Sequence, residues 1–249
     1  MKIVVNTRLL IKDKLEGIGW FTYETLKRIT IAHPEHEFYF LFDRKYDSSF
    51  IFSDNITPIV LSPQARHPIL FKIWFNWSVK RFLKKINADI FVSPDGYLSL
   101  TTRVPQIAVI HDLNFEHYPE FLPKHITKYY KTYFPLFAKK ATKIVTVSNF
   151  SKEDIIKQYK IEANKIDVVY NGINQRFKPI NELEIQKIKK QYTNNSPFFI
   201  YVGSLNPRKN IENTLRAFDQ FKKNTNSSHK FIIVGEKLWS NKSIEDCYN

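Results

Sequence analysis

The chain has 249 residues, 43% of them hydrophobic, which suits a globular protein with a sizeable core and argues against disorder. Its net charge of +14 would attract polyanions, which include nucleic acid, anionic lipid and phosphorylated small molecules. The alternative is that the charge only reflects a lysine-rich proteome. The single cysteine, Cys247, excludes an intramolecular disulfide and a thiolate metal cluster. No apolar run reaches roughly 18 residues, and the first run is too short for a signal peptide. We therefore expect a cytoplasmic protein, either soluble or peripheral on the inner face of the plasma membrane.

Short β-branched runs alternate with helical patterns up to residue 169. The predicted strands cover residues 2–6, 37–42, 89–93, 106–110, 143–147 and 166–169. The predicted helices cover residues 18–31, 68–86, 124–140 and 151–159. This alternation indicates βαβ units and a mostly parallel sheet, so the predicted fold class is α/β with a Rossmann-like N-terminal lobe.

A polar stretch with strong turn signals, Asn171-Gly172 and Pro179, follows this pattern. We place a domain boundary there, with the N-terminal lobe at residues 1–176 and a second lobe at residues 177–249. The α/β pattern then restarts, with predicted helices at 181–192 and 210–223 and predicted strands at 197–202 and 230–234. Two strands and one crossover helix cannot form a doubly wound sheet with both faces covered, so we expect the second Rossmann-like lobe to be incomplete.

Gly17 and Gly19 lie between the first predicted strand and its helix. Small residues let the backbone approach an anion, and the start of a helix offers unpaired N–H groups, so this segment is a candidate phosphate site. Thr22 replaces the third glycine of a full dinucleotide-binding fingerprint. The alternative is a flexible turn before a helix.

His111 directly follows the predicted strand at 106–110. Ligands of open α/β sheets bind at the carboxyl ends of strands, and a histidine there can donate a hydrogen bond to a sugar hydroxyl or to a developing charge. The alternative is a structural histidine that bonds to a loop carbonyl. Its position favours the functional interpretation.

Ser151 and Asp154 resemble a capping box at the start of the predicted helix 151–159, with Asp in place of the usual Glu. We expect Ser151 to cap that helix. Ser148 follows the strand 143–147 and is a weaker candidate for contact with a ligand.

The segment from Gly203 to Asn210 carries the most information about chemistry. Gly203 would let the backbone turn sharply beside a ligand, and Asn210 is expected to cap the next helix. Arg208 and Lys209 come just ahead of that helix. Two cations and the positive end of a helix dipole form a site for a diphosphate, where they would stabilise a nucleoside diphosphate as it departs. The alternative is a solvated basic turn.

The predicted helix 68–86 combines aromatic with basic residues. Its aromatic residues are Phe71, Trp74, Phe75, Trp77 and Phe82, and its basic residues are Lys72, Lys80, Arg81, Lys84 and Lys85. This combination suits an anionic membrane surface. A core helix with a solvated basic face is the favoured alternative, because aromatic stripes usually belong to a core.

In order along the chain, these segments resemble glycosyltransferase family 4, the retaining enzymes with the GT-B fold. Gly17-Ile18-Gly19 resembles the family's glycine loop. His111-Asp112-Leu113, with Pro119-Glu120 downstream, resembles a segment common in mannosyltransferase-like members. Further family segments are matched by Val147-Ser148 with Ser151, by Asn171-Gly172-Ile173 with Phe177 and Pro179, and by Gly203 with Arg208-Lys209-Asn210.

The resemblance implies roles for the candidate residues. Arg208 and Lys209 would bind the donor diphosphate, with Gly203 in the same loop and with Gly17 and Gly19 near the phosphates across a cleft. His111 would contact the transferred sugar, so that His111, Arg208 and Lys209 form the expected catalytic set. A donor phosphate oxygen would help to deprotonate the acceptor. Neither a metal nor a cofactor is expected, since the nucleotide sugar is a substrate.

The expected function is transfer of a hexose from a nucleotide-diphosphate sugar to a glycan or lipid-linked acceptor in cell-surface polysaccharide synthesis, with retention of configuration. Family members also carry a Glu-x7-Glu motif, for which Glu236 and Glu245 do not stand in. One alternative is therefore an inactive or split lobe whose partner is a second chain that supplies the missing part. A nucleic-acid binder ranks last, because the basic residues are spread along the chain rather than gathered in a known motif.

Overall fold

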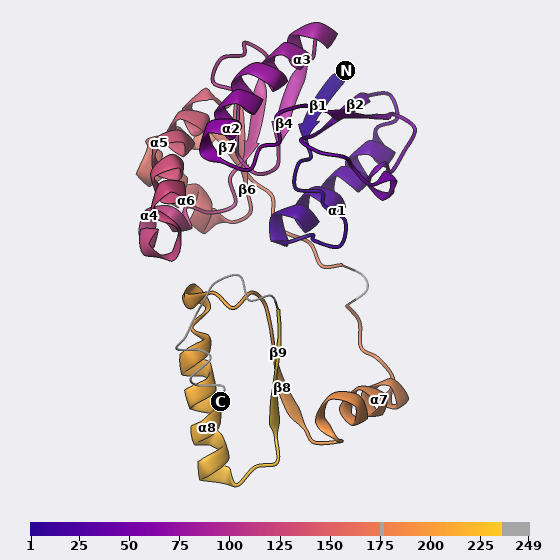
Figure 1. Cartoon of the computed structure of the whole chain (residues 1–249), viewed down its shortest axis with the longest axis vertical. Helices are drawn as coiled ribbons and strands as arrows, with labels where there is room; N and C mark the ends of the chain where they lie inside the picture. The colour runs from indigo at the N-terminus through magenta and orange to yellow at the C-terminus, as the bar shows by residue number, and fades with distance from the viewer. Residues whose placement is uncertain (175–176, 236–249) are drawn as a thin grey trace. The chain divides into compact units, whose positions relative to one another are not determined.

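The computed structural model describes residues 1–174 and 177–235. The chain divides into two compact units, Met1–Gly172 and Ile173–Asn249. The boundary therefore lies four residues before the one predicted from the sequence, which was between residues 176 and 177. Figure 1 shows both units.

The first unit is built on a parallel sheet of seven strands in the order β3-β2-β1-β4-β5-β6-β7. The strands are β1 (Lys2–Asn6), β2 (Glu37–Phe42), β3 (Ile56–Val60), β4 (Ile90–Ser93), β5 (Gln106–Val109), β6 (Lys143–Thr146) and β7 (Ile166–Val168). This order is Rossmann-like, with the direction of winding reversed between β1 and β4. The predicted α/β class and parallel N-terminal sheet are therefore confirmed.

Strand β3 is the strand of this sheet that the sequence pattern did not predict. It contains Pro58, which cannot donate a hydrogen bond to a neighbouring strand and therefore argues against a strand when only the sequence is read. The strand lies at the edge of the sheet and pairs only with β2, so the missing donor is tolerated there.

Helices cover both faces of this sheet (Figure 1). They are α1 (Gly17–Ala32), α2 (Pro68–Ile73), α3 (Lys80–Ile86), α4 (Asn114–His117), α5 (Lys124–Lys140) and α6 (Asn149–Tyr159). Successive side chains of a strand point to opposite faces, so Val4 and Val5 enter different cores. Val5 packs in a cluster with Leu26 of α1, and Val4 belongs to the larger cluster formed with α2, α3, α5 and α6.

The predicted helix 68–86 forms without a break, but its middle is π-helical rather than α-helical. A π-helical segment, Trp74–Val79, joins α2 to α3. Phe71, Trp74 and Phe75 are buried in the larger core, as the core interpretation of the aromatic residues predicted. Trp77 is 61% exposed and is not part of that core.

The start of α6 corrects one detail of the sequence analysis. Ser148, and not Ser151, is the N-cap residue, and its Oγ accepts a hydrogen bond from the backbone N–H of Ser151 at 3.0 Å. The helix begins two residues earlier than predicted, because Ser148 adopts the extended conformation that a cap requires.

The second unit contains α7 (Glu182–Thr193), β8 (Phe198–Val202), α8 (Ile211–Thr225) and β9 (Lys230–Val234). Strands β8 and β9 pair in parallel, and the crossover between them is α8. Phe218 and Phe221 of α8 pack against the ring of Phe199 on one face of this sheet. Helix α7 starts with a reciprocal capping box between Asn181 and Glu184.

Candidate functional site

The carboxyl edge of the first sheet is where a Rossmann-like fold places its ligands, and in particular at the point where the strand order reverses. Here that point lies between β1 and β4. The chain leaves β1 at Asn6, β4 at Ser93 and β5 at Val109, so the segments after these strands meet at this edge. His111, two residues beyond β5, is one of them.

His111 is half-buried and contacts three other segments of the first unit. Its Nε2 lies 2.9 Å from the carbonyl oxygen of Pro94, directly after β4. Its own carbonyl accepts a hydrogen bond from Ser151 Oγ at 3.0 Å. Its ring meets the ring of Phe21 edge-to-face, with centroids 4.9 Å apart. A hydrogen bond to a loop carbonyl, such as that of Pro94, is what the structural interpretation of His111 predicted. This bond uses Nε2 and leaves the other ring nitrogen, Nδ1, for a ligand.

Gly17 and Gly19 form the first turn of α1 rather than a separate loop before it. Gly17 is exposed, and a Cβ there would meet no atom within 4 Å. Gly19 is buried, and its Cβ would come within 3.1 Å of both Leu15 Cδ2 and the Leu9 carbonyl oxygen. The smallness of Gly19 is thus required by packing, whereas Gly17 leaves the helix start open to solvent. Their role in donor binding stays a prediction.

A buried polar cluster at the same edge was missed by the sequence analysis. Asp95 Oδ2 lies 2.8 Å from Arg8 Nη2, and these side chains are only 4% and 9% exposed. Asp95 Oδ1 accepts hydrogen bonds from Asn6 Nδ2 at 2.8 Å and from Ser93 Oγ at 2.9 Å. The available signal was the turn sequence Pro94-Asp95-Gly96 immediately after a predicted strand. Removing one partner of such a buried pair costs about 3–5 kcal/mol.

The loop of the second unit from Gly203 to Asn210 is held by its own backbone and by β9. Gly203 N donates to the carbonyl of Val234 at 2.8 Å. A Cβ at Gly203 would come within 2.8 Å of the Tyr201 hydroxyl. A Cβ at Gly235, which the sequence analysis did not name, would overlap the Gly203 carbonyl. Glycines at both positions therefore permit the close approach of the two strand ends.

Arg208 and Lys209 lie in a short 3-10 turn, Pro207–Lys209, immediately before α8, and both are exposed. Asn206 fixes this turn, because its Oδ1 accepts from Arg208 N at 3.0 Å and its carbonyl accepts from Lys209 N at 2.8 Å. Within residues 1–174 and 177–235, neither cation forms an ion pair.

The start of α8 differs from the prediction in a way that suits an anion. Asn210 occupies the N-cap position, but its backbone is left-handed and its side chain makes no capping hydrogen bond. Its Oδ1 accepts instead from Asn213 Nδ2 at 2.8 Å. Among residues 1–174 and 177–235, no side chain therefore caps the first-turn N–H groups of α8. These groups carry the positive end of the helix dipole beside Arg208 and Lys209.

The structure thus gathers the predicted residues into two groups. His111 and the α1 glycines lie in the first unit, and Gly203, Arg208 and Lys209 share one loop of the second. Glu236 and Glu245 lie outside the described residues.

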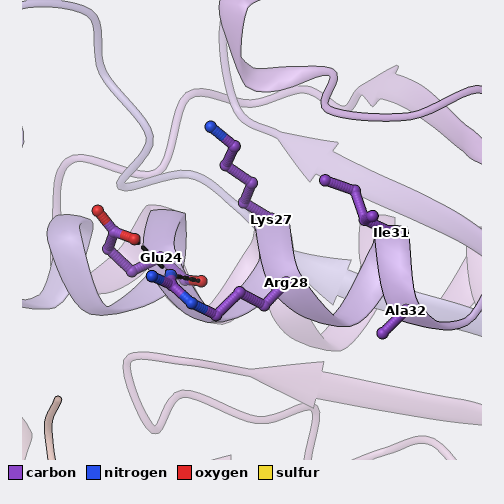
Figure 2. A pocket seen from close by; sticks show the side chains of 5 residues that line it. All are labelled: Glu24, Lys27, Arg28, Ile31 and Ala32. Atoms are coloured by element: carbon purple, nitrogen blue, oxygen red, sulfur yellow. Dashed lines mark hydrogen bonds and ion pairs between the residues drawn. The ribbon is translucent and has the colours of Figure 1, made fainter. Parts of the chain in front are cut away.

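A shallow pocket of about 470 Å³ lies elsewhere, along the exposed side of α1. It is lined by Glu24, Lys27, Arg28, Ile31 and Ala32. Figure 2 shows that all of these side chains come from the one helix, with Glu24 and Arg28 joined by an ion pair. None of the predicted site residues takes part, so this pocket is not the candidate site.

In the described part of the chain, only one group of side chains has the geometry to hold a metal ion: His33, Glu35 and His36. These residues lie in the turn between α1 and β2, where β2 begins. That is the amino edge of the sheet, opposite the edge that carries His111, so a metal there would not reach the candidate site.

Comparison with known proteins decides the family. The model of Glycosyltransferase Family 4 matches residues 17–177, which is more than half of the chain. The chain belongs to glycosyltransferase family 4. A second model, Glycosyl transferases group 1, matches residues 184–248.

Named relatives agree with membership of glycosyltransferase family 4. O-antigen chain mannosyltransferase B of Escherichia coli is 26% identical over 256 residues, covering 96% of this chain and 65% of the relative. O-antigen chain mannosyltransferase RfbU of Salmonella typhimurium is 26% identical over 180 residues, covering 72% of this chain and 46% of the relative. The chain thus spans less than two thirds of the length of these relatives.

A solved structure agrees in fold. Anabaena HepE, solved in complex with UDP and glucose, matches with a TM-score of 0.65 at 16% identity, covering 100% of this chain and 65% of that chain. Together with the family match, this likeness confirms the predicted GT-B type. No helix among the described residues has the length and apolar character to cross a bilayer.

Proposed function

We propose that this chain carries the sugar-transfer chemistry of its family. In this proposal a hexose moves from a nucleotide-diphosphate sugar to a glycan or lipid-linked acceptor of a cell-surface polysaccharide, and its anomeric configuration is retained. The names of the two O-antigen mannosyltransferases support the acceptor class. The UDP and glucose named for Anabaena HepE support the donor class.

The observation that carries the proposal is the basic turn ahead of α8. Arg208 and Lys209 are exposed, and they lie beside the start of α8. In the part of the chain that the structure describes, neither cation forms an ion pair and no side chain caps this helix start. Charge-assisted hydrogen bonds from such cations, together with free N–H groups, match the oxygens of a diphosphate. Negative charge grows on this diphosphate as the sugar departs, so the same contacts would stabilise the transition state.

His111 supplies the second half of the proposal. It lies at the edge of the sheet where ligands of this fold bind, and one of its ring nitrogens makes no hydrogen bond within the described chain. We assign it to contact with a hydroxyl of the transferred sugar. A donor phosphate oxygen would deprotonate the acceptor, so the proposal requires neither a metal nor a cofactor.

Isothermal titration of the folded chain with UDP, GDP, dTDP and their sugars tests the donor site. We expect one of these nucleotides to bind and to yield transfer when an acceptor is present. A folded chain that binds none of them would contradict a working donor site. Binding without transfer, together with co-purification of a second polypeptide, would favour the split-lobe alternative.

We also propose that the first unit binds an anionic membrane surface through α2, α3 and the π-helical segment between them. Ile69, Ile73 and Trp77 are spaced four apart and are 61%, 42% and 61% exposed, so they form an apolar stripe. The exposed basic residues beside it are Lys72, Lys80, Arg81, Lys84 and Lys85, and no acidic residue occurs in residues 68–86. An apolar stripe flanked by cations is the pattern of an interfacial helix.

A further inference from the structure

The turn after β4 is buried, and several contacts fix it in place. Ser93 to Gly96 form a β-turn closed by Gly96 N donating to the Ser93 carbonyl at 3.2 Å, with Pro94 in the second position. Gly96 has a positive φ of 81°, and a Cβ there would come within 3.1 Å of the Phe134 ring and 3.2 Å of the Val109 carbonyl oxygen. The turn therefore has little freedom to move.

The carboxylate of Asp95 ties this turn to the end of β1. Its Oδ1 accepts from Asn6 Nδ2 at 2.8 Å and from Ser93 Oγ at 2.9 Å, and its Oδ2 pairs with Arg8 at 2.8 Å. The Arg8 guanidinium is itself enclosed, with its Cζ 4.6 Å from the ring centroid of Tyr97 and 5.0 Å from that of Phe71. The buried pair of Arg8 and Asp95 therefore joins the end of β1 to the turn after β4.

The hydrogen bond from this turn decides the chemistry of His111. A carbonyl oxygen only accepts, so the 2.9 Å contact with Pro94 requires a hydrogen on His111 Nε2. In the neutral imidazole the other nitrogen, Nδ1, then carries a lone pair and no hydrogen. From the sequence, His111 was expected to donate a hydrogen bond to the substrate. With Nε2 committed to Pro94, the neutral ring can only accept at Nδ1.

We propose that Asp95 is a positioning residue for His111. Asp95 fixes the 93–96 turn, so that the Pro94 carbonyl holds the imidazole of His111 as the Nε2–H tautomer. In this tautomer Nδ1 accepts a hydrogen bond from a hydroxyl group of the sugar substrate. The tautomer follows from the first unit alone. Only the assignment of the Nδ1 partner rests on the proposed function. The sugars that fit are those with a free hydroxyl at the position that contacts Nδ1. Replacement of that hydroxyl by fluorine or hydrogen removes the hydrogen-bond donor.

The test measures the tautomer directly. Two-bond ¹H–¹⁵N correlation spectra of the full chain, at a pH where the ring is neutral, distinguish Nε2–H from Nδ1–H for His111. We expect the Nε2–H pattern in the parent protein. An Nδ1–H pattern there would overturn the proposal without any variant.

Asp95→Asn keeps the side-chain size and one acceptor but removes the charge that holds Arg8. We expect the His111 ¹⁵N resonances to shift toward the average of the two tautomers, and kcat to fall about tenfold with a donor KM within about twofold of the parent. Ser93→Ala removes two hydrogen bonds, the one that Ser93 Oγ donates to Asp95 and the one that it accepts from Asn6 Nδ2, but it keeps the pair between Asp95 and Arg8. It should shift the resonances less in the same direction, which keeps the test open if Asp95→Asn does not fold. Parent-like resonances in both folded variants would also overturn the proposal.

Asp43→Asn is the matched control. Asp43 is a buried carboxylate directly after β2 that accepts from Ala65 N at 2.9 Å and pairs with Arg44. Its charge also acts on Arg8, but it makes no hydrogen bond to the 93–96 turn and leaves the pair between Asp95 and Arg8 in place. This variant should lose thermal stability and keep the parent tautomer. The tautomer measurement also separates the positioning role of Asp95 from the proposed sugar transfer. A parent chain with an Nε2–H ring that binds no nucleotide sugar would contradict the proposed function and leave the positioning role intact.

Discussion

The ring of Phe21 stands edge-on to the imidazole of His111, with centroids 4.9 Å apart and planes at 89°. Phe21 lies on α1, one helical turn after Gly17, so this contact joins the glycine-containing helix start to the residue that follows β5. Phe21 and His111 are 90 positions apart in the chain (111 − 21), and this contact brings them together at the carboxyl edge of the sheet.

Replacement of Phe21 should impair transfer more than folding. An edge-to-face pair contributes about 0.5–1.5 kcal/mol, so Phe21→Ala should lower the melting temperature only modestly. We expect kcat/KM to fall about tenfold, because the freed imidazole samples unproductive orientations. Trp20→Ala is the control, since this neighbouring ring contacts Tyr23 instead, with centroids 5.7 Å apart. Equal losses of activity in the two variants would contradict the role of Phe21.

Replacement of Arg208 should weaken binding of the diphosphate. A hydrogen bond to a charged group contributes about 1.5–3 kcal/mol, so Arg208→Ala should raise the Kd for the nucleoside diphosphate about tenfold to a hundredfold, measured by titration calorimetry. Lys209→Ala should act in the same direction. Lys223→Ala removes the same charge from an exposed position on α8, where Lys223 pairs with Asp219, and should leave the Kd unchanged. A parent-like Kd in both Arg208→Ala and Lys209→Ala would remove the basis of the donor site.

Replacement of Trp77 should weaken membrane binding without affecting nucleotide binding. Co-sedimentation with vesicles of phosphatidylcholine, with and without phosphatidylglycerol, should show binding only to the anionic vesicles and less binding at high salt. Trp77→Ala should reduce the bound fraction severalfold, since an exposed indole favours the interface. Trp20→Ala, which removes a 44% exposed indole from α1, should not reduce it. Equal binding to neutral vesicles would exclude the electrostatic part of the proposal.

Alkaline pH should destabilise the first unit through its buried tyrosines. Burial raises the pKa of Tyr97 well above its ordinary value, and burial likewise raises the pKa of Tyr129 and Tyr159. In the unfolded chain these phenols ionise near pH ~10. Because the folded pKa is the higher one, the stability that these groups contribute is complete below about pH 10 and is lost as the pH rises further.

Thermal melts across that range, with tyrosinate absorbance recorded in parallel, check this expectation. Tyr97→Phe keeps the ring but removes the ionisable group, so the fall in melting temperature above about pH 10 should become shallower. Tyr170→Phe alters a tyrosine that is 63% exposed and should leave the slope as it was. Parallel slopes for the parent and Tyr97→Phe would show that the hydroxyl of Tyr97 is not involved.

Much of the fold followed from local pattern. Strands β1, β2 and β9 and helix α5 begin and end at the predicted residues, because their apolar periodicity and their turn signals agree. Strand β3 did not follow, since Pro58 is acceptable only at the edge of a sheet, and a sequence does not state which strand is the edge. The division of the aromatic residues of 68–86 into core and surface also required the structure, because a π-helical segment changes which positions share a face.

The sequence by itself determined which residue types are available for chemistry: a histidine after a strand, glycines at a helix start, and paired cations ahead of another helix. These are local features, fixed by a few neighbouring residues. Only the tertiary structure decided that Asp95 and Arg8 form a buried pair, and that the turn they hold bonds to Nε2 of His111. Such contacts join residues far apart in the chain, and no local pattern specifies them, because they arise from the order in which the strands assemble into the sheet.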